Sequence, residues 1–154
     1  MKRTWIIAAA LLLLLGGGFA VYSGTRGLRN NNPGNIRKGA VAWLGEVPGT
    51  DPDFATFDTP EHGIRALGIL LRNYQRRWGL DTVREIISRY APSNENDTAA
   101  YVMDVAARLN VTPDERLNLN SDATLTALVQ AVIHHENGVQ PYSVATLAAG
   151  IGAA

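Results

Sequence analysis

Apolar residues recur at three- and four-residue spacing along the second half of the chain, and this pattern predicts amphipathic helices. Four segments carry the pattern, and each begins after a residue that can cap a helix N-terminus. They follow Thr59, Thr82, Asp97 or Thr98, and Ser121, and they end near residues 78, 90, 109 and 137. Gly79-Leu80-Asp81 is expected to break the first of these helices, and a left-handed stop is expected at Asn137-Gly138. Thr112 to Glu115 reads as a further capping box and predicts a short turn of helix.

The region before these helices is polar and irregular. Thr25 to Lys38 contains three consecutive Asn residues, a Pro and two Gly residues, which predicts an ordered turn rather than a helix. Ala40 to Val47 and Phe54 to Phe57 are strand candidates separated by a turn over Pro48 to Asp53, and together they predict a small β-ribbon. A tail of small residues is expected after Pro141-Tyr142. The expected fold class is mainly α, of the α+β kind.

The N-terminal segment has the pattern of an export signal. Lys2 and Arg3 precede Trp5 to Tyr22, a run without charged residues that just reaches the length needed to span a bilayer. Gly18-Phe19-Ala20 also fits a signal-peptidase site, so a removable signal peptide is the alternative to a signal anchor. We expect residues 1–22 to be this segment. Residues 23–154 would then be exported, either tethered to the inner membrane or released into the periplasm.

Composition narrows the functional classes. The chain has 154 residues, about one domain, and contains no cysteine, so it has no disulfide or thiolate chemistry. Its 14 basic residues balance its 14 acidic ones, which argues against a dedicated nucleic-acid-binding protein. We expect a monomer without a bound cofactor or metal.

Glu136 is the main candidate for chemistry. It occupies the last turn of the final predicted helix, where the negative end of the helix dipole disfavours another negative charge. Such a break of a local rule without visible compensation suggests a functional site, whereas the alternative is an exposed carboxylate at a frayed helix end. Glu136 also follows an apolar helix face, and partial burial favours the protonated form that a general acid needs.

Glycosidases pair such an acid with a second, solvated carboxylate. Glu46, Asp58 and Glu61 are the candidate partners. Glu46 follows Trp43, whose ring could stack on a ligand, but it equally fits the surface of a strand. Glu61 lies in a first helical turn, where the helix dipole explains it without a function.

The Asn-rich turn is a candidate sugar-binding loop. Each Asn amide offers two donors and an acceptor, which suits sugar hydroxyls and N-acetyl groups. The alternative is a linker that leaves the membrane. The candidate residues in this loop are Asn31, Asn32 and Asn35.

The run RGLRNNNPGNIRKG, followed by WLG, FATFDTPEHGIRAL and RYAPSNENDTAAYVMDVA, resembles small phage and prophage lysis proteins of the lysozyme-like group. The resemblance covers roughly Arg26 to Tyr142. More distantly, the order of these motifs is similar to that in flagellar-type glucosaminidases and lytic transglycosylases, in which a helix ending in Glu-Ser/Asn-Gly comes before the motifs. Here His135-Glu136-Asn137-Gly138 comes after them, which suggests a permuted order.

The resemblance implies a lysozyme-like domain with Glu136 as general acid, Tyr101 as a cleft tyrosine, and Asn31, Asn32 and Asn35 shaping the cleft. Tyr101 fits the buried face of its helix equally well. The expected activity is that of a phage endolysin, a muramidase or lytic transglycosylase that cleaves the β-1,4 bonds of peptidoglycan.

Two other classes are open. A zinc peptidase could use His62, His134 and His135 with Glu136, although adjacent histidines on a helix point about 100° apart and do not easily share a metal. A non-catalytic virion or wall-binding protein could keep the sugar cleft without cleaving its ligand.

Overall fold

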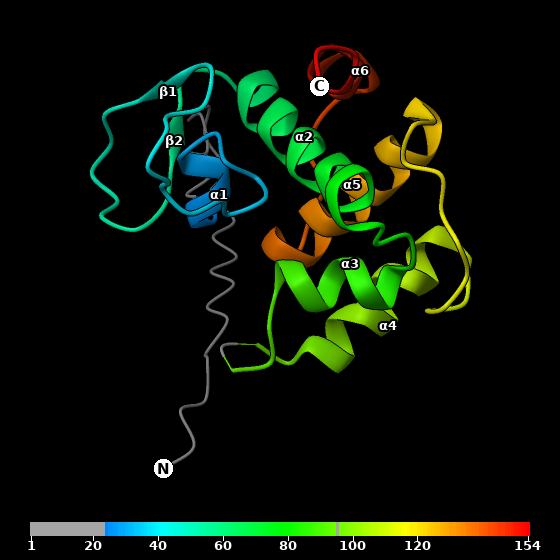
Figure 1. Cartoon of the computed structure of the whole chain (residues 1–154). Coiled ribbons are helices and arrows are strands. Elements are labelled where there is room, and N and C mark those ends of the chain that lie inside the picture. Colours follow the sequence, from blue (N-terminus) through cyan, green and yellow to red (C-terminus); the bar gives the residue numbers. More distant parts are fainter. Residues whose placement is uncertain (1–23, 95) are drawn as a thin grey trace, which may run out of the picture.

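The computed structural model describes residues 24–94 and 96–154, which form a helical domain with a two-stranded ribbon at one side (Figure 1). The elements are α1 (Arg26–Arg29), β1 (Glu46–Val47), β2 (Thr56–Phe57), α2 (Pro60–Trp78), α3 (Val83–Tyr90), α4 (Thr98–Leu109), α5 (Asp122–Asn137) and α6 (Val144–Gly152). The expected α+β class is therefore confirmed. The predicted export segment lies outside the described residues, and within those residues no helix has the length and hydropathy needed to cross a bilayer.

The four longer predicted helices are present, and their caps are those that the sequence predicts. The hydroxyls of Thr59, Thr82 and Ser121 each accept a backbone N–H from the first turn of α2, α3 and α5. Thr82 also forms the reciprocal capping box with Glu85. Asp97 rather than Thr98 caps α4. Local sequence thus determines where these helices begin.

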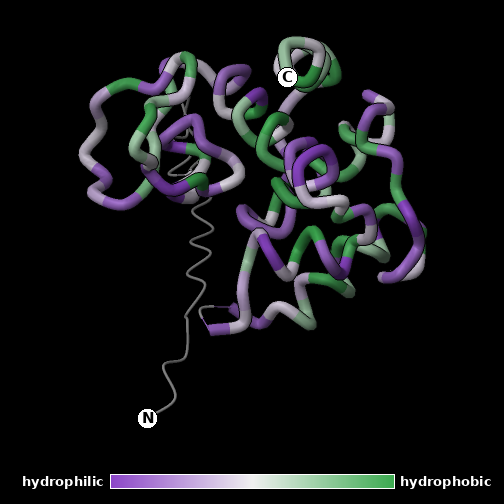
Figure 2. The backbone as a smooth tube through the Cα atoms, in the orientation of Figure 1, coloured by the Kyte–Doolittle hydropathy of each residue, from purple (hydrophilic) through white to green (hydrophobic). Residues whose placement is uncertain are grey.

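The core lies where α2 and α5 meet the other helices. Helix α2 packs along α6 and α5, and α4 packs against both α3 and α5. Hydrophobic and hydrophilic residues alternate within the turns of α3 and α4 (Figure 2), as expected for helices that are buried on one side. The largest fully buried aliphatic side chains include Ile64, Leu67, Leu71, Ile86, Ile87, Leu125, Leu128 and Ile133.

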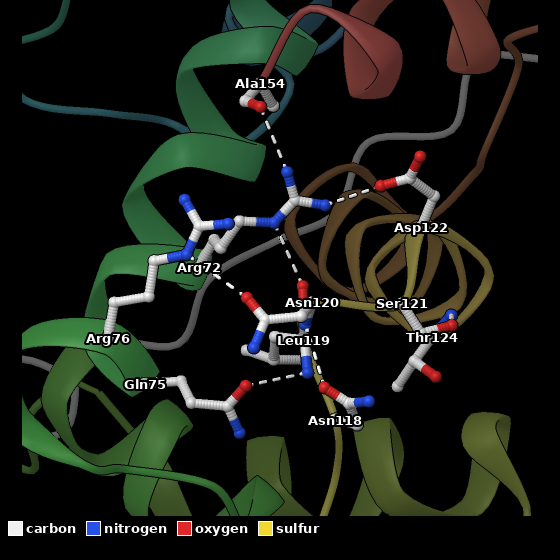
Figure 3. Close-up of polar contacts among 10 residues, drawn as sticks. All are labelled: Arg72, Gln75, Arg76, Asn118, Leu119, Asn120, Ser121, Asp122, Thr124 and Ala154. Atoms are coloured by element: carbon white, nitrogen blue, oxygen red, sulfur yellow. Dashed lines mark hydrogen bonds and ion pairs between the residues drawn. The ribbon is translucent and has the colours of Figure 1, made fainter.

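Arg72 fixes the first turn of α5 to the middle of α2. This side chain is only 6% exposed, and it donates to the Leu119 carbonyl at 3.0 Å, to Asp122 at 2.6 Å and to the Ala154 oxygen at 3.0 Å. Figure 3 shows these bonds spreading from one guanidinium to three segments. Because α5 is held at this end, the position of its opposite end, which carries Glu136, is also defined.

The β-ribbon is shorter than the sequence predicts. Glu46 pairs with Phe57 and Val47 with Thr56 in antiparallel register, so each strand has two residues. Residues 40–44 do not extend the first strand, because the chain turns at Gly45 (φ 76°). The prediction of a strand from Ala40 to Val47 was therefore wrong in length.

The tail of small residues after Tyr142 forms a helix, α6, which the sequence analysis did not predict. Ser143 caps α6, and Leu147, Gly150 and Ile151 form its buried side against α2. A Cβ atom at Gly150 would lie 2.5 Å from the Ile64 side chain, so glycine lets the two helices approach closely.

Three smaller expectations also need correction. The Asn-rich region begins with the four-residue helix α1, capped by Thr25. Thr112 to Glu115 forms a turn closed by the Glu115 N–H on the Thr112 carbonyl at 3.1 Å, without continuing into a helix. The apolar spacing of α2 continues to Trp78 and predicts a buried side chain there, but Trp78 ends the helix 49% exposed, with the Arg89 guanidinium 3.9 Å from its ring centroid.

Candidate active site

The Asn-rich loop owes its shape to its own amides. Asn32 is 1% exposed, and its side chain bonds the Ile36 N–H, the Ile36 carbonyl and the Ala55 carbonyl at 2.8–2.9 Å. Asn31 and Asn35 both adopt left-handed backbone with φ 48°, which Asn tolerates better than most residues. The Asn31 amide donates to the Phe57 carbonyl at 3.0 Å. Asn31 and Asn32 therefore hold the loop against β2.

Asn137 ties this loop to the end of α5. Its amide is 8% exposed and donates to the Pro33 carbonyl at 2.8 Å and to the Ile133 carbonyl at 2.9 Å. Its oxygen accepts the Thr25 hydroxyl. Gly27 makes room for this contact, since a Cβ atom there would lie 2.6 Å from the Asn137 oxygen. Gly138, with φ 75°, ends the helix directly afterwards.

Glu136 is thereby placed between the loop and α4. One carboxylate oxygen accepts the Asn35 amide at 2.8 Å, and the other accepts the Tyr101 hydroxyl at 2.9 Å. The two donors lie 101 and 35 positions away along the chain. A carboxylate has acceptor capacity beyond these two bonds, so Glu136 is oriented without being saturated.

Two tyrosines, Tyr90 and Tyr101, pack against each other next to this carboxylate. Tyr101 is 3% exposed, and its ring meets that of Tyr90 edge to face at 6.3 Å between centroids. The Tyr90 hydroxyl donates to the Gly34 carbonyl in the Asn loop. Burial first, and then the nearby Glu136 charge, raise the pKa of Tyr90 well above its usual value. Burial likewise raises the pKa of Tyr101, so this phenol remains a proton-bearing donor to the carboxylate.

His135 extends the network on the far side of Tyr101. Its ring stacks on the tyrosine ring with centroids 3.6 Å apart, and its Nδ1 lies 2.8 Å from Asp104. Partial burial raises the pKa of Asp104, but the hydrogen bonds with Arg108 and His135 outweigh it and hold this pKa below the usual value. Asp104 is thus a charged group that fixes the imidazole, and the imidazole in turn packs against Tyr101.

A cleft of about 590 Å³ opens above Glu136. Its walls carry aromatic rings, and its polar groups are amides, two guanidinium groups and one carboxylate. The lining includes Trp43, Phe54, Tyr74 and Tyr90 together with Arg26, Arg37, Asn35, Asn96 and Glu136. Among the described lining residues, Glu136 is the one carboxylate. Flat apolar surfaces beside a few convergent polar groups suit a sugar chain.

The residues singled out from the sequence therefore divide into two groups. Asn35, Trp43 and Glu136 line the cleft. Tyr101 does not line it, but its hydroxyl donates to Glu136. Asn31 and Asn32 shape the loop behind it. Glu46 lies in β1, where its carboxylate accepts the Trp43 N–H at 2.9 Å, so it supports the turn that carries this ring. A role for Glu46 as second carboxylate stays a prediction.

The other candidate carboxylates lie elsewhere. Asp58 contacts His62 Nδ1 at 2.6 Å, and this hydrogen bond lowers the pKa of Asp58. Glu61 is in the first turn of α2, as expected. Burial, and to a smaller extent the Glu61 charge, raise the pKa of Tyr142 to about 12. The histidines of the zinc alternative do not converge, and the part of the chain that the structure describes holds no group of three residues suited to a metal ion.

Sequence reasoning missed the supporting roles of Asn137 and Asp104 and the pairing of Arg26 with Phe54. Asn137 was interpreted as part of a helix stop, although an Asn before the terminal Gly can also be a buried amide. Asp104 carried no signal beyond its position on α4. The pairing of Arg26 with Phe54 joins residues from α1 and the ribbon, which no local pattern reveals.

Comparison with known proteins adds one relative. No protein-family model matches the chain. The chain is similar to Protein P5 of Pseudoalteromonas phage PM2, with 42% identity over 127 residues, covering 80% of this chain and 78% of the relative. Identity of this extent over most of both chains establishes common descent, so the chain belongs to the same family as Protein P5 of Pseudoalteromonas phage PM2.

Proposed function

We propose that this protein cleaves the β-1,4 bonds of peptidoglycan glycan strands, with Glu136 as its general acid. The observation that carries the proposal is the placement of the Glu136 carboxylate on the cleft wall, between the Asn35 amide and the Tyr101 hydroxyl. A lysozyme-like domain places its acid in a comparable setting, at a helix end beside a sugar cleft.

In this mechanism the protonated Glu136 carboxyl gives its proton to the glycosidic oxygen as the C–O bond breaks. The departing sugar leaves with a hydroxyl, and positive charge develops on the remaining ring. The Asn35 and Tyr101 donors then bind the carboxylate that forms, in the same orientation in which the proton was held. These two residues would thus set the geometry of proton transfer.

Two routes complete the reaction. A water activated by a second carboxylate gives a reducing end, whereas attack by the 6-hydroxyl of the muramyl sugar gives a 1,6-anhydro end. Glu136 is the only carboxylate among the described cleft residues, which favours the second route, that of a lytic transglycosylase. In the second route Glu136 takes back the proton that the 6-hydroxyl loses, whereas in the first the second carboxylate takes the proton of the water and Glu136 is reprotonated from solvent.

The proposed setting is the wall of a bacterial host. The relative is a phage protein, and the peptidoglycan of a bacterial host lies outside its inner membrane. We infer that the uncharged segment after Lys2 and Arg3 exports the domain and tethers it to the inner membrane, or is removed to release it. Replacing residues 1–22 by a cleavable leader should then advance lysis. Equal lysis times for both forms would refute the tether.

Product analysis tests the activity itself. Purified sacculi are treated with the full chain, and the soluble fragments are identified by mass spectrometry. Anhydro-muramyl ends would establish a transglycosylase, and reducing ends a muramidase. Sedimentation of the protein with sacculi without any released fragment would refute cleavage and favour a non-catalytic wall-binding or virion protein.

A further inference from the structure

One wall of the cleft carries two guanidinium groups on one aromatic ring. The Arg26 Cζ atom lies 3.5 Å from the centroid of the Phe54 ring, and the Arg37 Cζ atom lies 5.0 Å from it. All three residues line the same cleft as Glu136. Stacking on an aromatic face holds a guanidinium in a fixed plane.

The position of Arg26 relative to the proposed acid is set by Asn35. The Asn35 oxygen accepts the Arg26 Nε–H at 3.4 Å, and its nitrogen donates to Glu136 at 2.8 Å. One amide therefore spans the gap between the carboxylate and the guanidinium. A sugar whose glycosidic oxygen reaches Glu136 would carry its ring substituents toward Arg26.

Asp51, an acidic residue whose charge interacts with Arg26, is already bonded to other groups. Asp51 accepts the N–H groups of Asp53 and Phe54 at 3.0 Å, and the Asn30 amide at 3.3 Å. Arg26 acts on it through charge and is the smallest of the influences that lower the pKa of Asp51. The Asp51 carboxylate thus offsets part of the positive charge without forming a close ion pair with Arg26.

We propose that Arg26, stacked on Phe54 beside Arg37, forms an anion subsite that binds a carboxylate carried by the muramyl unit of the substrate. The inference rests on the proposed function and adds which glycan the cleft selects. Peptidoglycan differs from chitin in its charge. Its muramyl unit bears a lactyl group, which ends in a carboxylate or carries the stem peptide, whereas chitin is uncharged. A planar guanidinium binds a carboxylate through two parallel N–H bonds, which gives both charge and orientation. The subsite would therefore select wall glycan over chitin.

The test separates binding from cleavage. Glu136→Gln in the full chain provides a protein for calorimetric titration with three probes. These are a muramyl tetrasaccharide with stem peptides, the same tetrasaccharide without peptides, and chitotetraose. The peptide-free probe exposes the lactyl carboxylate, so the two muramyl probes distinguish the sources of the charge. Arg26→Gln and Arg26→Lys are then added to Glu136→Gln, with Arg116→Gln as the control.

Arg116 is a matched control because its side chain is 85% exposed and it lines a separate cavity near α5. We expect one or both muramyl probes to bind more tightly than chitotetraose. Arg26→Gln should remove this preference with a loss of about tenfold, as for one charge-assisted hydrogen bond at an open site. Arg26→Lys should restore part of it, and Arg116→Gln should leave it unchanged. Circular dichroism checks that each variant is folded.

Three results would overturn the subsite. They are equal binding of all probes, no binding of any probe at millimolar concentration, and a loss in Arg26→Gln that is the same for chitotetraose. Cleavage of sacculi by the wild type is measured separately. A carboxylate preference without cleavage would retain the subsite and reject the proposed reaction, whereas cleavage without the preference would do the reverse.

Discussion

Gly63 allows the Asn loop to lie directly on α2, and its replacement by alanine is the sharpest test of how the site is built. A Cβ atom at this position would be 1.8 Å from the Asn31 carbonyl oxygen and 2.9 Å from its carbon. Ordinary contact begins at 3.4 Å. The obstacle is backbone, so it cannot rotate away as a flexible side chain would, and the loop must retreat by more than an ångström.

The expected cost combines two opposing effects. Overpacking of this kind costs up to about 3 kcal/mol, whereas alanine in a helix gains about 1 kcal/mol over glycine. The net loss for Gly63→Ala is therefore about 2 kcal/mol, which lowers Tm by roughly 4–8 °C in a domain of this size. Gly152→Ala in α6 is the matched control, because a Cβ atom there meets nothing within 4 Å. That variant should be neutral or slightly stabilised.

Calorimetric melting of both variants measures this difference, and cleavage of sacculi at a temperature where each is folded measures its effect on the site. Gly63→Ala should lose activity beyond its loss of folded protein, because displacement of Asn31 also moves Asn35 away from Glu136. If Gly63→Ala melts as high as the wild type and cleaves as fast, the loop does not rest on α2 as described.

Three further predictions concern the supporting groups. Asn137→Ala leaves the Pro33 carbonyl and the Thr25 hydroxyl without their partner, so urea unfolding should show a loss of about 2 kcal/mol; an unchanged midpoint would contradict the anchoring role. The lowered pKa of Asp104 contributes stability that is present above its unfolded value of 3.8 and is lost as pH falls through the folded value. Asp104→Asn should therefore flatten the acid limb of a stability–pH curve, and an identical limb would count against it. The pKa of Tyr142, raised from 10.0 to about 12, means that the unfolded chain ionises first, so stability declines from pH 10 upward. Tyr142→Phe should reduce that decline and remove one phenolate transition near pH 12 from the absorbance titration, whereas loss of a transition near pH 10 in this variant would contradict the raised pKa.

The sequence predicts best what depends on neighbours along the chain. The N-termini of three helices could be predicted from Thr59, Thr82 and Ser121, because a capping side chain bonds backbone within one turn. Glu136 was identifiable for the same reason, since a carboxylate in a last helical turn conflicts with the local dipole. The structure supplies the compensation that the sequence did not show, namely the donors Asn35 and Tyr101.

The rest depends on contacts between distant segments. Helix α6 consists largely of Ala and Gly, so its apolar spacing is weak until α2 is present to pack against it. The Asn137 amide bonds the Pro33 carbonyl, which lies 104 positions away along the chain. Arg26 likewise contacts Phe54 only when the ribbon is in place. None of these pairings has a signal within a single turn of chain. The place of Trp78 was missed because helical periodicity does not indicate where the core ends.

The proposed reaction depends most on Glu136 as the proton donor. The direct measurement is the initial rate of fragment release from sacculi by the wild type, Glu136→Gln and Glu46→Gln, with sedimentation on sacculi recording binding by each. Loss of a general acid costs about 10²–10⁴-fold, so Glu136→Gln should bind sacculi while releasing fragments at least 100-fold more slowly. Glu46→Gln should stay close to the wild type, because its carboxylate accepts the Trp43 N–H and its amide oxygen can do the same. Wild-type rates from Glu136→Gln, or a collapse confined to Glu46→Gln, would move the acid elsewhere and contradict the proposed reaction.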